Sequence, residues 1–221
     1  MVKDRAQIEK SKDDFSLPTL LVVRKKTLEA VQEISRQIEV GMYEEDAYEM
    51  AKSVLKEMGS DKSWHRPWIR FGPNTLKPYS VLSEPHVRLG PDDIFFIDIG
   101  PVWDGYEGDG GDTFVTGANE ELRQCKDDVK RLFDLVKKQW KNEHWSGQKL
   151  YQYAVHKAKE LGWELNLRAN GHRLSDFPHA IYFKGGLADV NFEPLPHAWV
   201  LEIQIRHPAK NFGAFYEDLL F

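Results

Sequence analysis

The sequence predicts an α+β fold in which helices pack on a curved antiparallel sheet. Three observations support this class. Helical and extended segments come in blocks, in the order helices, strands, helices, strands, which is typical of α+β folds. The longer helical segments are apolar on one face. Several short apolar strands each contain an acidic residue, so polar groups are expected inside the fold.

Two segments near the start of the chain are predicted to be helices, residues 20–40 and 44–58. Apolar side chains recur at helical spacing in the first segment, which indicates one buried face. Gly41 and Gly59 are expected to end the two helices. Residues 64–71 are predicted to be extended, and the Gly-Pro-Asn sequence after them is a turn signal.

The elements after residue 90 are predicted from the same kinds of pattern. Residues 94–99 form a nearly continuous apolar run, as expected of a buried strand. The dipeptide Asp104-Gly105 predicts a hairpin turn shortly after it. The later elements are two helices and then two strands, predicted at residues 120–141, 147–161, 199–205 and 212–220.

Length and composition limit the domain organisation and the class of partner. The 221 residues, 41% of them apolar, are enough for one domain with a sizeable core. We expect a single catalytic domain over residues 1–221, with residues 1–17 as a flexible N-terminal extension. The net charge of −5 gives no basic stripe to neutralise phosphates, so no nucleic-acid partner is expected.

The location of the chain is predicted from its cysteine usage and its apolar runs. The one cysteine, Cys125, excludes an internal disulfide and fits a reducing compartment; it is expected to be a packed thiol on a helix. The sequence contains no apolar run of about 18 residues, so no membrane span is expected. Residues 1–15 do not resemble a signal peptide. The expected location is the cytoplasm.

Two aspartates form the first candidate site. Asp98 interrupts the apolar strand at residues 94–99, where a buried carboxylate needs a cation or several hydrogen-bond donors. Asp109 follows eleven positions later, beyond the Asp104-Gly105 turn, so that a hairpin would bring the two carboxylates together. Two adjacent carboxylates repel unless a proton or a metal ion lies between them. The alternative is that Asp109 is a solvated residue of a glycine-rich loop.

Two histidines and two further acids complete the set. His172 follows an Asn-Gly turn, and His179 comes seven residues later; each is a candidate metal ligand, or a structural residue with satisfied hydrogen bonds. Glu202 and Glu217 each interrupt an apolar strand. Glu202 and Gln204 share one strand face by alternation, and that face points either toward a site or toward solvent. Glu217 is otherwise an exposed strand end.

Taken together, four carboxylates and one histidine favour an oxygen-rich centre. Such a set suits a pair of Mn, Fe, Co or Zn ions, with Mn or Fe favoured. It does not suit a structural zinc site, which prefers thiolates. The five candidate ligands are Asp98, Asp109, His172, Glu202 and Glu217.

These residues resemble a known superfamily. The sequence of residues 98–114, DIGPVWDGYEGDGGDTF, is similar to the metal-binding hairpin of methionine aminopeptidase, aminopeptidase P (Xaa-Pro aminopeptidase) and creatinase. In that superfamily two aspartates stand the same distance apart, and a threonine follows the second by four positions. The segments around His172, His179, Glu202 and Glu217 resemble its later site segments, in the same order. The resemblance covers roughly residue 74 to the end of the chain and implies the pita-bread fold.

The resemblance also implies roles for the candidate residues. Asp98 would bind one ion, Asp109 and Glu217 would bridge two, and His172 and Glu202 would bind the second. Glu202 would accept the proton of a water nucleophile, and His179 would hydrogen-bond the substrate. A homodimer is a possible assembly.

The sequence departs from the superfamily pattern upstream of Asp98. The superfamily has a histidine shortly after an asparagine, whereas counting from Asn74 leads to Tyr79 or Ser80. His65 and His86 are near this position but out of register.

Three functions remain open from the sequence. The first is a hydrolase that cleaves an N-terminal peptide or small amide bond, with Xaa-Pro-type substrates favoured over Met-type ones. The second is a non-peptidase enzyme of the same fold, acting on a small amino-acid-derived metabolite. The third is a non-catalytic binding module, against which the five retained ligands argue. Trp64, Tyr79 and His207 are candidate substrate-binding residues, with core packing as the alternative.

Overall fold

A computed structural model describes residues 4–221 of the chain. Its main element is a twisted antiparallel sheet of strands in the order β2-β3-β6-β10-β9-β7, with β8 also paired to β9. A small second sheet has the order β1-β4-β5. The strands are β1 Lys62–Ser63, β2 Trp68–Phe71, β3 Ile94–Ile99, β4 Pro101–Trp103, β5 Tyr106–Glu107, β6 Gly110–Val115, β7 Glu164–Leu165, β8 His172–Arg173, β9 Trp199–Arg206 and β10 Gly213–Leu219.

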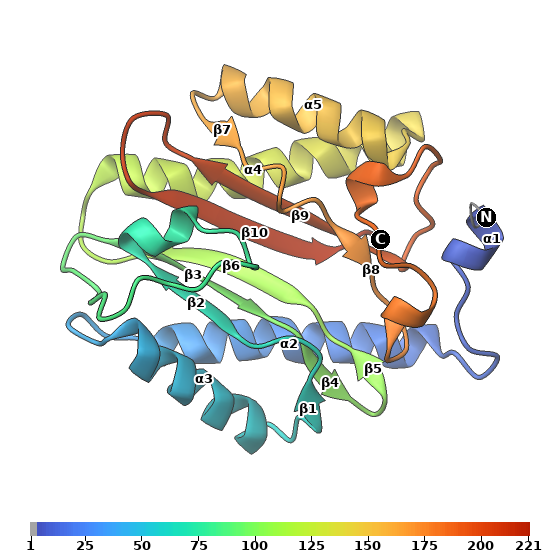
Figure 1. Cartoon of the computed structure of the whole chain (residues 1–221), viewed down its shortest axis with the longest axis horizontal. Coiled ribbons are helices and arrows are strands. Elements are labelled where there is room, and N and C mark those ends of the chain that lie inside the picture. The colour runs from blue at the N-terminus through green and yellow to red at the C-terminus, as the bar shows by residue number, and fades with distance from the viewer. Residues whose placement is uncertain (1–3) are drawn as a thin grey trace.

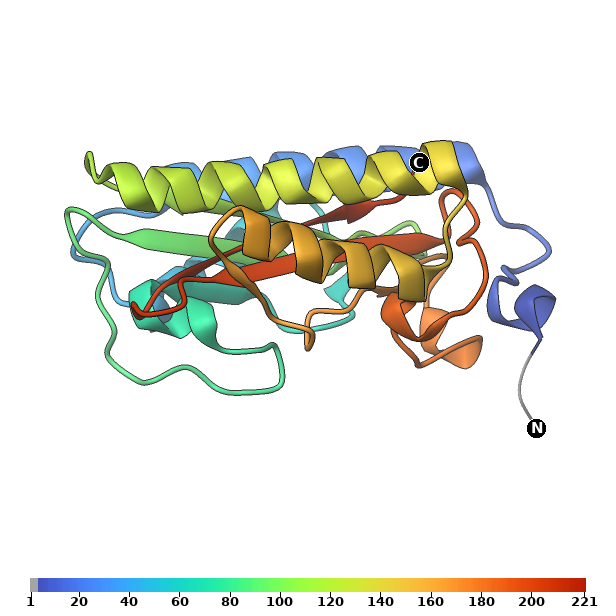
Figure 2. The same ribbon diagram turned by 90° about the horizontal axis from the view of Figure 1, so that it is seen from above.

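Two long helices cover one face of the large sheet. Figure 2 shows α2 and α4 side by side on that face, while α3 and α5 flank the sheet on its two sides (Figure 1). The opposite face carries the loops and short 3-10 helices of the chain. The helices are α1 Arg5–Ile8, α2 Leu17–Gln37, α3 Glu44–Glu57, α4 Glu120–Glu143 and α5 Gly147–Glu160, and the 3-10 helices are η1 Gly72–Leu76, η2 His179–Ile181 and η3 Leu187–Asp189. This mixed arrangement confirms the predicted α+β pita-bread fold.

The predicted elements agree with the observed ones, apart from their ends. Helix α2 begins three residues earlier than expected, because Ser16 caps it by accepting a hydrogen bond from the Thr19 amide and Pro18 is tolerated in a first turn. It ends at Gln37, because Ile38 is already extended. Strand β3 has the predicted bounds, and the hairpin turn at Asp104-Gly105 is confirmed, with positive φ at both residues.

The two largest clusters of the hydrophobic core lie beneath the helices. One cluster joins α2 and α3 to strands β2 and β3. The other joins α4 and α5 to strands β9 and β10 and contains the fully buried Cys125. Cys125 is therefore the packed helical thiol that the sequence predicts. In the described part of the chain, no helix has the length and apolar character that a bilayer crossing requires.

Strand alternation directs polar groups to the sheet face opposite α2 and α4. Ile97 and Ile99 of β3 pack into the core, so Asp98 points the other way. In β9 the flanking Leu201 and Ile203 are in the core, so Glu202 shares the open face with Gln204, as predicted. Each acid is thus held by a strand whose other face is anchored by apolar burial.

The N-terminal segment is packed, in contrast to the flexible extension predicted for residues 1–17. The guanidinium of the fully buried Arg173 donates hydrogen bonds to the carbonyl oxygens of Ile8 and Lys10. Glu9 accepts hydrogen bonds from the Leu195 amide and the Trp199 indole. Residues 4–16 are therefore anchored beside strand β8. The first three residues of the predicted extension lie outside the described part of the chain.

Candidate metal centre

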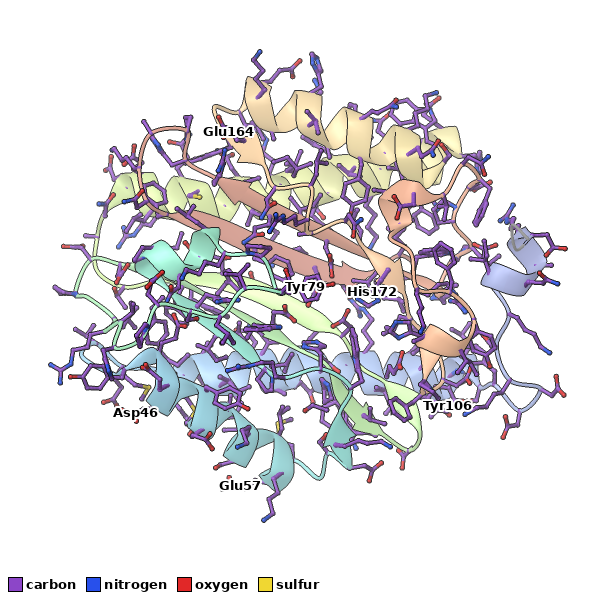
Figure 3. All side chains as sticks on the ribbon, in the orientation of Figure 1. Asp46, Glu57, Tyr79, Tyr106, Glu164 and His172 are labelled. Carbon is purple, nitrogen blue, oxygen red and sulfur yellow. The ribbon has the colours of Figure 1, made fainter. Side chains whose placement is uncertain are left out.

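The five predicted ligands converge on one cavity of about 220 Å³ on the open face of the sheet. Asp98, Glu202 and Glu217 come from strands β3, β9 and β10, Asp109 directly precedes β6, and His172 comes from β8. Figure 3 shows His172 and Tyr79 on this side of the sheet. The cavity is lined by Trp64, His65, Trp68, Tyr79, Asp98, Asp109, Asn170, Gly171, His172, His179, Lys184, Gly185, Gly186, Glu202 and Glu217.

Asp109 lies at the centre of this group and presents its two oxygens to different neighbours. Its Oδ2 lies 2.8 Å from Nε2 of His172. Its Oδ1 lies 3.5 Å from Nε2 of His65. The carboxylate is buried, with 2% of the residue exposed. The alternative of a solvated loop residue is therefore wrong for Asp109.

His172 is oriented by its own backbone. Its Nδ1 lies 2.6 Å from the carbonyl oxygen of Arg173, so Nδ1 carries the proton and donates it to that oxygen. In the neutral ring Nε2 is then a free acceptor, directed at Asp109 and 3.6 Å from Oε1 of Glu202. Two acceptors facing each other require a cation or a proton between them.

Glu202 is fixed at both its main chain and its side chain. Tyr151 from α5 donates its hydroxyl proton to the Glu202 carbonyl oxygen at 2.8 Å. The Gly171 amide donates to Oε2 of Glu202 at 3.1 Å. Gly171 has φ +67, and a side chain there would lie 2.5 Å from a carbonyl oxygen of β9. The Asn-Gly-His turn can therefore approach β9 only with glycine at this position.

His65 belongs to the group, although the sequence did not predict it among the ligands. Its Nε2 lies 3.4 Å from Oδ1 of Asp98, in addition to its contact with Asp109. In sequence it is out of register with the histidine of the superfamily. Its position depends on the pairing of β1 with β4, and two-residue strands leave no periodic signal in a sequence.

His179 lies beside the ligands and is held by a second residue that the sequence did not predict, Glu107. The buried carboxylate of Glu107 accepts a hydrogen bond from the His179 amide at 3.0 Å and lies 2.6 Å from Nδ1 of the ring. The rings of His179 and His172 are stacked, with 5.2 Å between their centroids. The carboxylate fixes the orientation of His179, and Nε2 remains available for other contacts.

The three predicted substrate-binding residues have different positions. Trp64 lines the cavity, and its indole donates to the Gly108 carbonyl oxygen at 2.9 Å. Tyr79 lines the outer part of the cavity and is 66% exposed. The structure does not bring His207 to this cavity: its ring packs on Trp163 and Phe212. The reason is that β9 runs on past Glu202 as far as Arg206 and so carries His207 beyond the site.

Burial and charge oppose each other at the two imidazoles. Burial alone would lower the pKa of His65, but the carboxylates of Asp98 and Asp109 outweigh it and raise the pKa to about 9. At His172 burial is again outweighed, here by Asp109 and Glu202, and the pKa rises to about 10. The cavity is therefore a region of negative potential that favours cations.

The carboxylates respond to the same two effects. Burial, opposed by the charge of His65, raises the pKa of Asp98 to about 7. Burial and the neighbouring carboxylates raise the pKa of Glu217 far above its ordinary value, and burial raises that of Glu202. Burial would also raise the pKa of Asp109, but the two imidazoles outweigh it and lower that pKa.

Unpaired buried oxygens show that these residues fit a metal. Both oxygens of Asp109 and Oε1 of Glu217 are buried without a hydrogen-bond partner. The 2.8 Å approach of His172 to Asp109 is an ion pair only when the imidazole is protonated. Such oxygens are costly to bury unless a cation binds them. The potential ligand atoms form two groups, and within each group all the atoms lie within 4.8 Å of one another. One group is His65, Asp98 and Asp109, and the other is Asp109, His172 and Glu217, so that Asp109 belongs to both.

The fold and the site together define a pita-bread domain with a carboxylate-rich cluster able to hold divalent metal. The chain belongs to metallopeptidase family M24, whose sequence model matches residues 22–220. Members of this family use divalent metals. No curated protein sequence matched the chain.

Solved structures similar to the chain include an aminopeptidase, a prolidase and a dipeptidase. The X-Pro aminopeptidase from Thermotoga maritima MSB8 has a TM-score of 0.70 and 19% identity over 98% of this chain and 58% of its own. The recombinant prolidase from Thermococcus sibiricus has a TM-score of 0.78 and 17% identity over 96% and 58%. The Xaa-Pro dipeptidase from Bacillus anthracis has a TM-score of 0.74 and 17% identity over 96% and 59%. The chain thus spans somewhat more than half the length of these proteins.

Proposed function

We propose that the chain is a metal-dependent hydrolase that cleaves the bond after the N-terminal residue of a short peptide, with proline after that bond. The observation that carries the proposal is the buried Asp109, whose two unpaired oxygens face two different groups of ligand atoms. A carboxylate in this position suits a bridge between two ions. Membership of metallopeptidase family M24 and structural similarity to an X-Pro aminopeptidase, a prolidase and an Xaa-Pro dipeptidase support a peptide substrate.

The five predicted ligands would hold two divalent ions, for which their oxygen-rich chemistry favours Mn or Fe. Asp109 and Glu217 would bind both ions. Asp98 would complete the site of one ion, and His172 and Glu202 would complete the site of the other. When bound, a pair of such ions lowers the pKa of a water molecule and stabilises negative charge on a carbonyl oxygen.

Glu202, in addition to binding metal, and three residues beside the ligands would act directly on water and substrate. Glu202, whose pKa is raised by burial, would accept a proton from the water nucleophile, since a base with a pKa nearer to neutrality is more effective. His179 would hydrogen-bond the substrate carbonyl through Nε2, because Nδ1 is held by Glu107. Trp64 and Tyr79 would form the wall against which the proline ring packs.

The test combines metal content with a substrate panel. We expect purified chain, loaded with Mn²⁺, to contain two ions per chain and to hydrolyse Ala-Pro and Met-Pro peptides faster than Met-Ala or Ala-Ala peptides. Absence of bindable Mn, Fe, Co or Zn would overturn the enzyme assignment. If the chain bound metal and hydrolysed a small amino-acid-derived metabolite such as creatine, but no peptide, the peptidase proposal would be replaced by a non-peptidase enzyme of the same fold.

A further inference from the structure

We propose that His65 is a sixth protein ligand of the metal centre, on the ion held by Asp98, so that each of the two ions binds one imidazole. The inference rests on the proposed two-metal site and adds a residue to it. The geometry is symmetrical about Asp109: Oδ1 faces His65 and Oδ2 faces His172. A second carboxylate lies near each ring: Asp98 is 3.4 Å from Nε2 of His65, and Glu202 is 3.6 Å from Nε2 of His172.

The two histidines share one local arrangement that fixes the tautomer of the ring. Nδ1 of His65 lies 2.7 Å from the carbonyl oxygen of Arg66, and Nδ1 of His172 lies 2.6 Å from that of Arg173. In each ring the proton on Nδ1 is donated to the next residue's carbonyl. This hydrogen bond is the usual outer-shell support of a metal-binding histidine, and it leaves Nε2 free to bind an ion.

The separations around His65 suit an ion better than a direct contact. Nε2 of His65 lies 3.4 Å from Asp98 and 3.5 Å from Asp109, too far for a strong hydrogen bond to either. Two ligand atoms at these separations can both reach one ion at ordinary bond lengths of about 2.1 Å. Oδ1 of Asp109 has no hydrogen-bond partner that would compete for this place.

The main chain places His65 at the site through contacts that leave little freedom. Pairing of β1 with β4 aligns Ser63 with Pro101, and the Trp64 amide donates to the Gly100 carbonyl oxygen at 2.8 Å. A Cβ atom at Gly100 would lie 2.2 Å from Cδ2 of His65 and 2.4 Å from Nε1 of Trp64. Glycine directly after strand β3 therefore admits the imidazole to the edge of Asp98.

A protonated His65 that only forms ion pairs is the main alternative. In that case the ring would balance the charge of the metal-free cluster and would leave when the ion binds. A ring that contacts substrate is a second alternative. Both differ from ligation in one respect: the metal would bind equally well without the imidazole.

The experiment compares metal binding by His65→Ala, His172→Ala and the control His179→Ala, each titrated with Mn²⁺ after chelation and checked by circular dichroism. We expect two ions for the wild type and for His179→Ala. Each of the other two variants should keep one ion and bind the second at least about tenfold more weakly. If His65→Ala bound both Mn²⁺ ions with unchanged affinity while His172→Ala lost affinity for one, the proposal that His65 is a ligand would be overturned. The proposed two-metal function would stand. A wild type that binds no metal would overturn the proposed function as well.

Two further measurements do not depend on folding of the His65 variant. X-ray absorption of the cobalt-loaded wild type should count one imidazole per cobalt ion, whereas the five-ligand set predicts one for every two ions. The variant Gly100→Ala, which displaces His65 without removing it, should reproduce the weakened second site. An imidazole count of one for every two ions would refute the proposal.

Discussion

Glu202 and Glu217 are directly opposite each other in the antiparallel pair of strands β9 and β10. Both are at the buried site, and like charges in this cross-strand position are destabilising. Glu217 meets Gly111 of β6 on its other side, which offers no side chain to balance it. The strand pairing therefore places two carboxylates side by side, where a bound cation would stabilise them.

From this pairing we predict that metal binding stabilises the fold. An ion that binds only the folded chain contributes about 4 kcal/mol at a concentration 1,000 times its dissociation constant. For a chain of this length, each kcal/mol raises the melting temperature by about 2–4 °C. Calorimetry of chelated chain with and without Mn²⁺ should show a rise of about 10 °C. An unchanged melting temperature would contradict a metal centre formed by folding.

Asp109→Asn should remove both ions. An amide oxygen is a weak bridge, and its nitrogen would face His65 or His172 as a donor. We expect metal content below a tenth of the wild-type value, turnover lower by about 10³-fold or more, and an unchanged circular dichroism spectrum. The matched control is Asp112→Asn, three residues later in strand β6, where the side chain instead faces Lys130 of α4. Loss of metal in the control would show that the effect is not local to the cavity.

Glu107→Gln should lower turnover and leave the metals in place. The glutamine side chain has the same size as the glutamate but orients His179 less strongly. The buried carboxylate contacts both the backbone N–H and Nδ1 of His179. We expect turnover to fall by about 10- to 100-fold, less than the roughly 10²–10³-fold cost of removing a donor to the substrate oxygen outright, with Mn content unchanged by mass spectrometry. The surface variant Glu164→Gln, which disturbs only a pair with Arg206, should match the wild type. Metal loss in Glu107→Gln would mean that Glu107 supports the ligands themselves.

Cys125 should resist alkylation in the native chain. Burial, with added repulsion from Asp128 and Glu121, raises the pKa of its thiol far above the ordinary value, and the thiolate is the reactive form. Iodoacetamide at pH 8 should modify less than a tenth of the chain in an hour, whereas the chain in concentrated urea should react fully. Rapid labelling of the native chain, detected by intact mass, would show that α4 opens from the sheet.

The sequence was most informative where regular structure and chemistry coincide. Asp98, Glu202 and Glu217 each interrupt an apolar strand, and strand alternation then determines the face on which the acid lies. The burial of their neighbours makes that face unambiguous. The order of these acids along the chain, together with His172 and the hairpin at residues 98–114 that contains Asp109, carried the resemblance from which the fold was predicted.

Features that depend on contacts between distant, short segments were not predictable. His65 reaches the cavity because Lys62 pairs with Val102, and a two-residue strand has no period to detect. The packing of residues 4–16 depends on the buried Arg173, whose hydrogen bonds span more than 160 positions of the chain. The strand before His207 was predicted almost to its observed end at Arg206, but the sequence does not show that the residue after it packs on Trp163 and Phe212.

The position of Trp64 gives the protein an intrinsic optical probe. Its ring lies 4.3 Å from that of His65 and 5.1 Å from those of both His172 and His179, measured between centroids. Its fluorescence will therefore be quenched strongly when a coloured or paramagnetic ion such as Co²⁺ enters beside any of these rings. The difference in emission between the wild type and Trp64→Phe would follow occupancy of the centre in real time, without a label or a substrate.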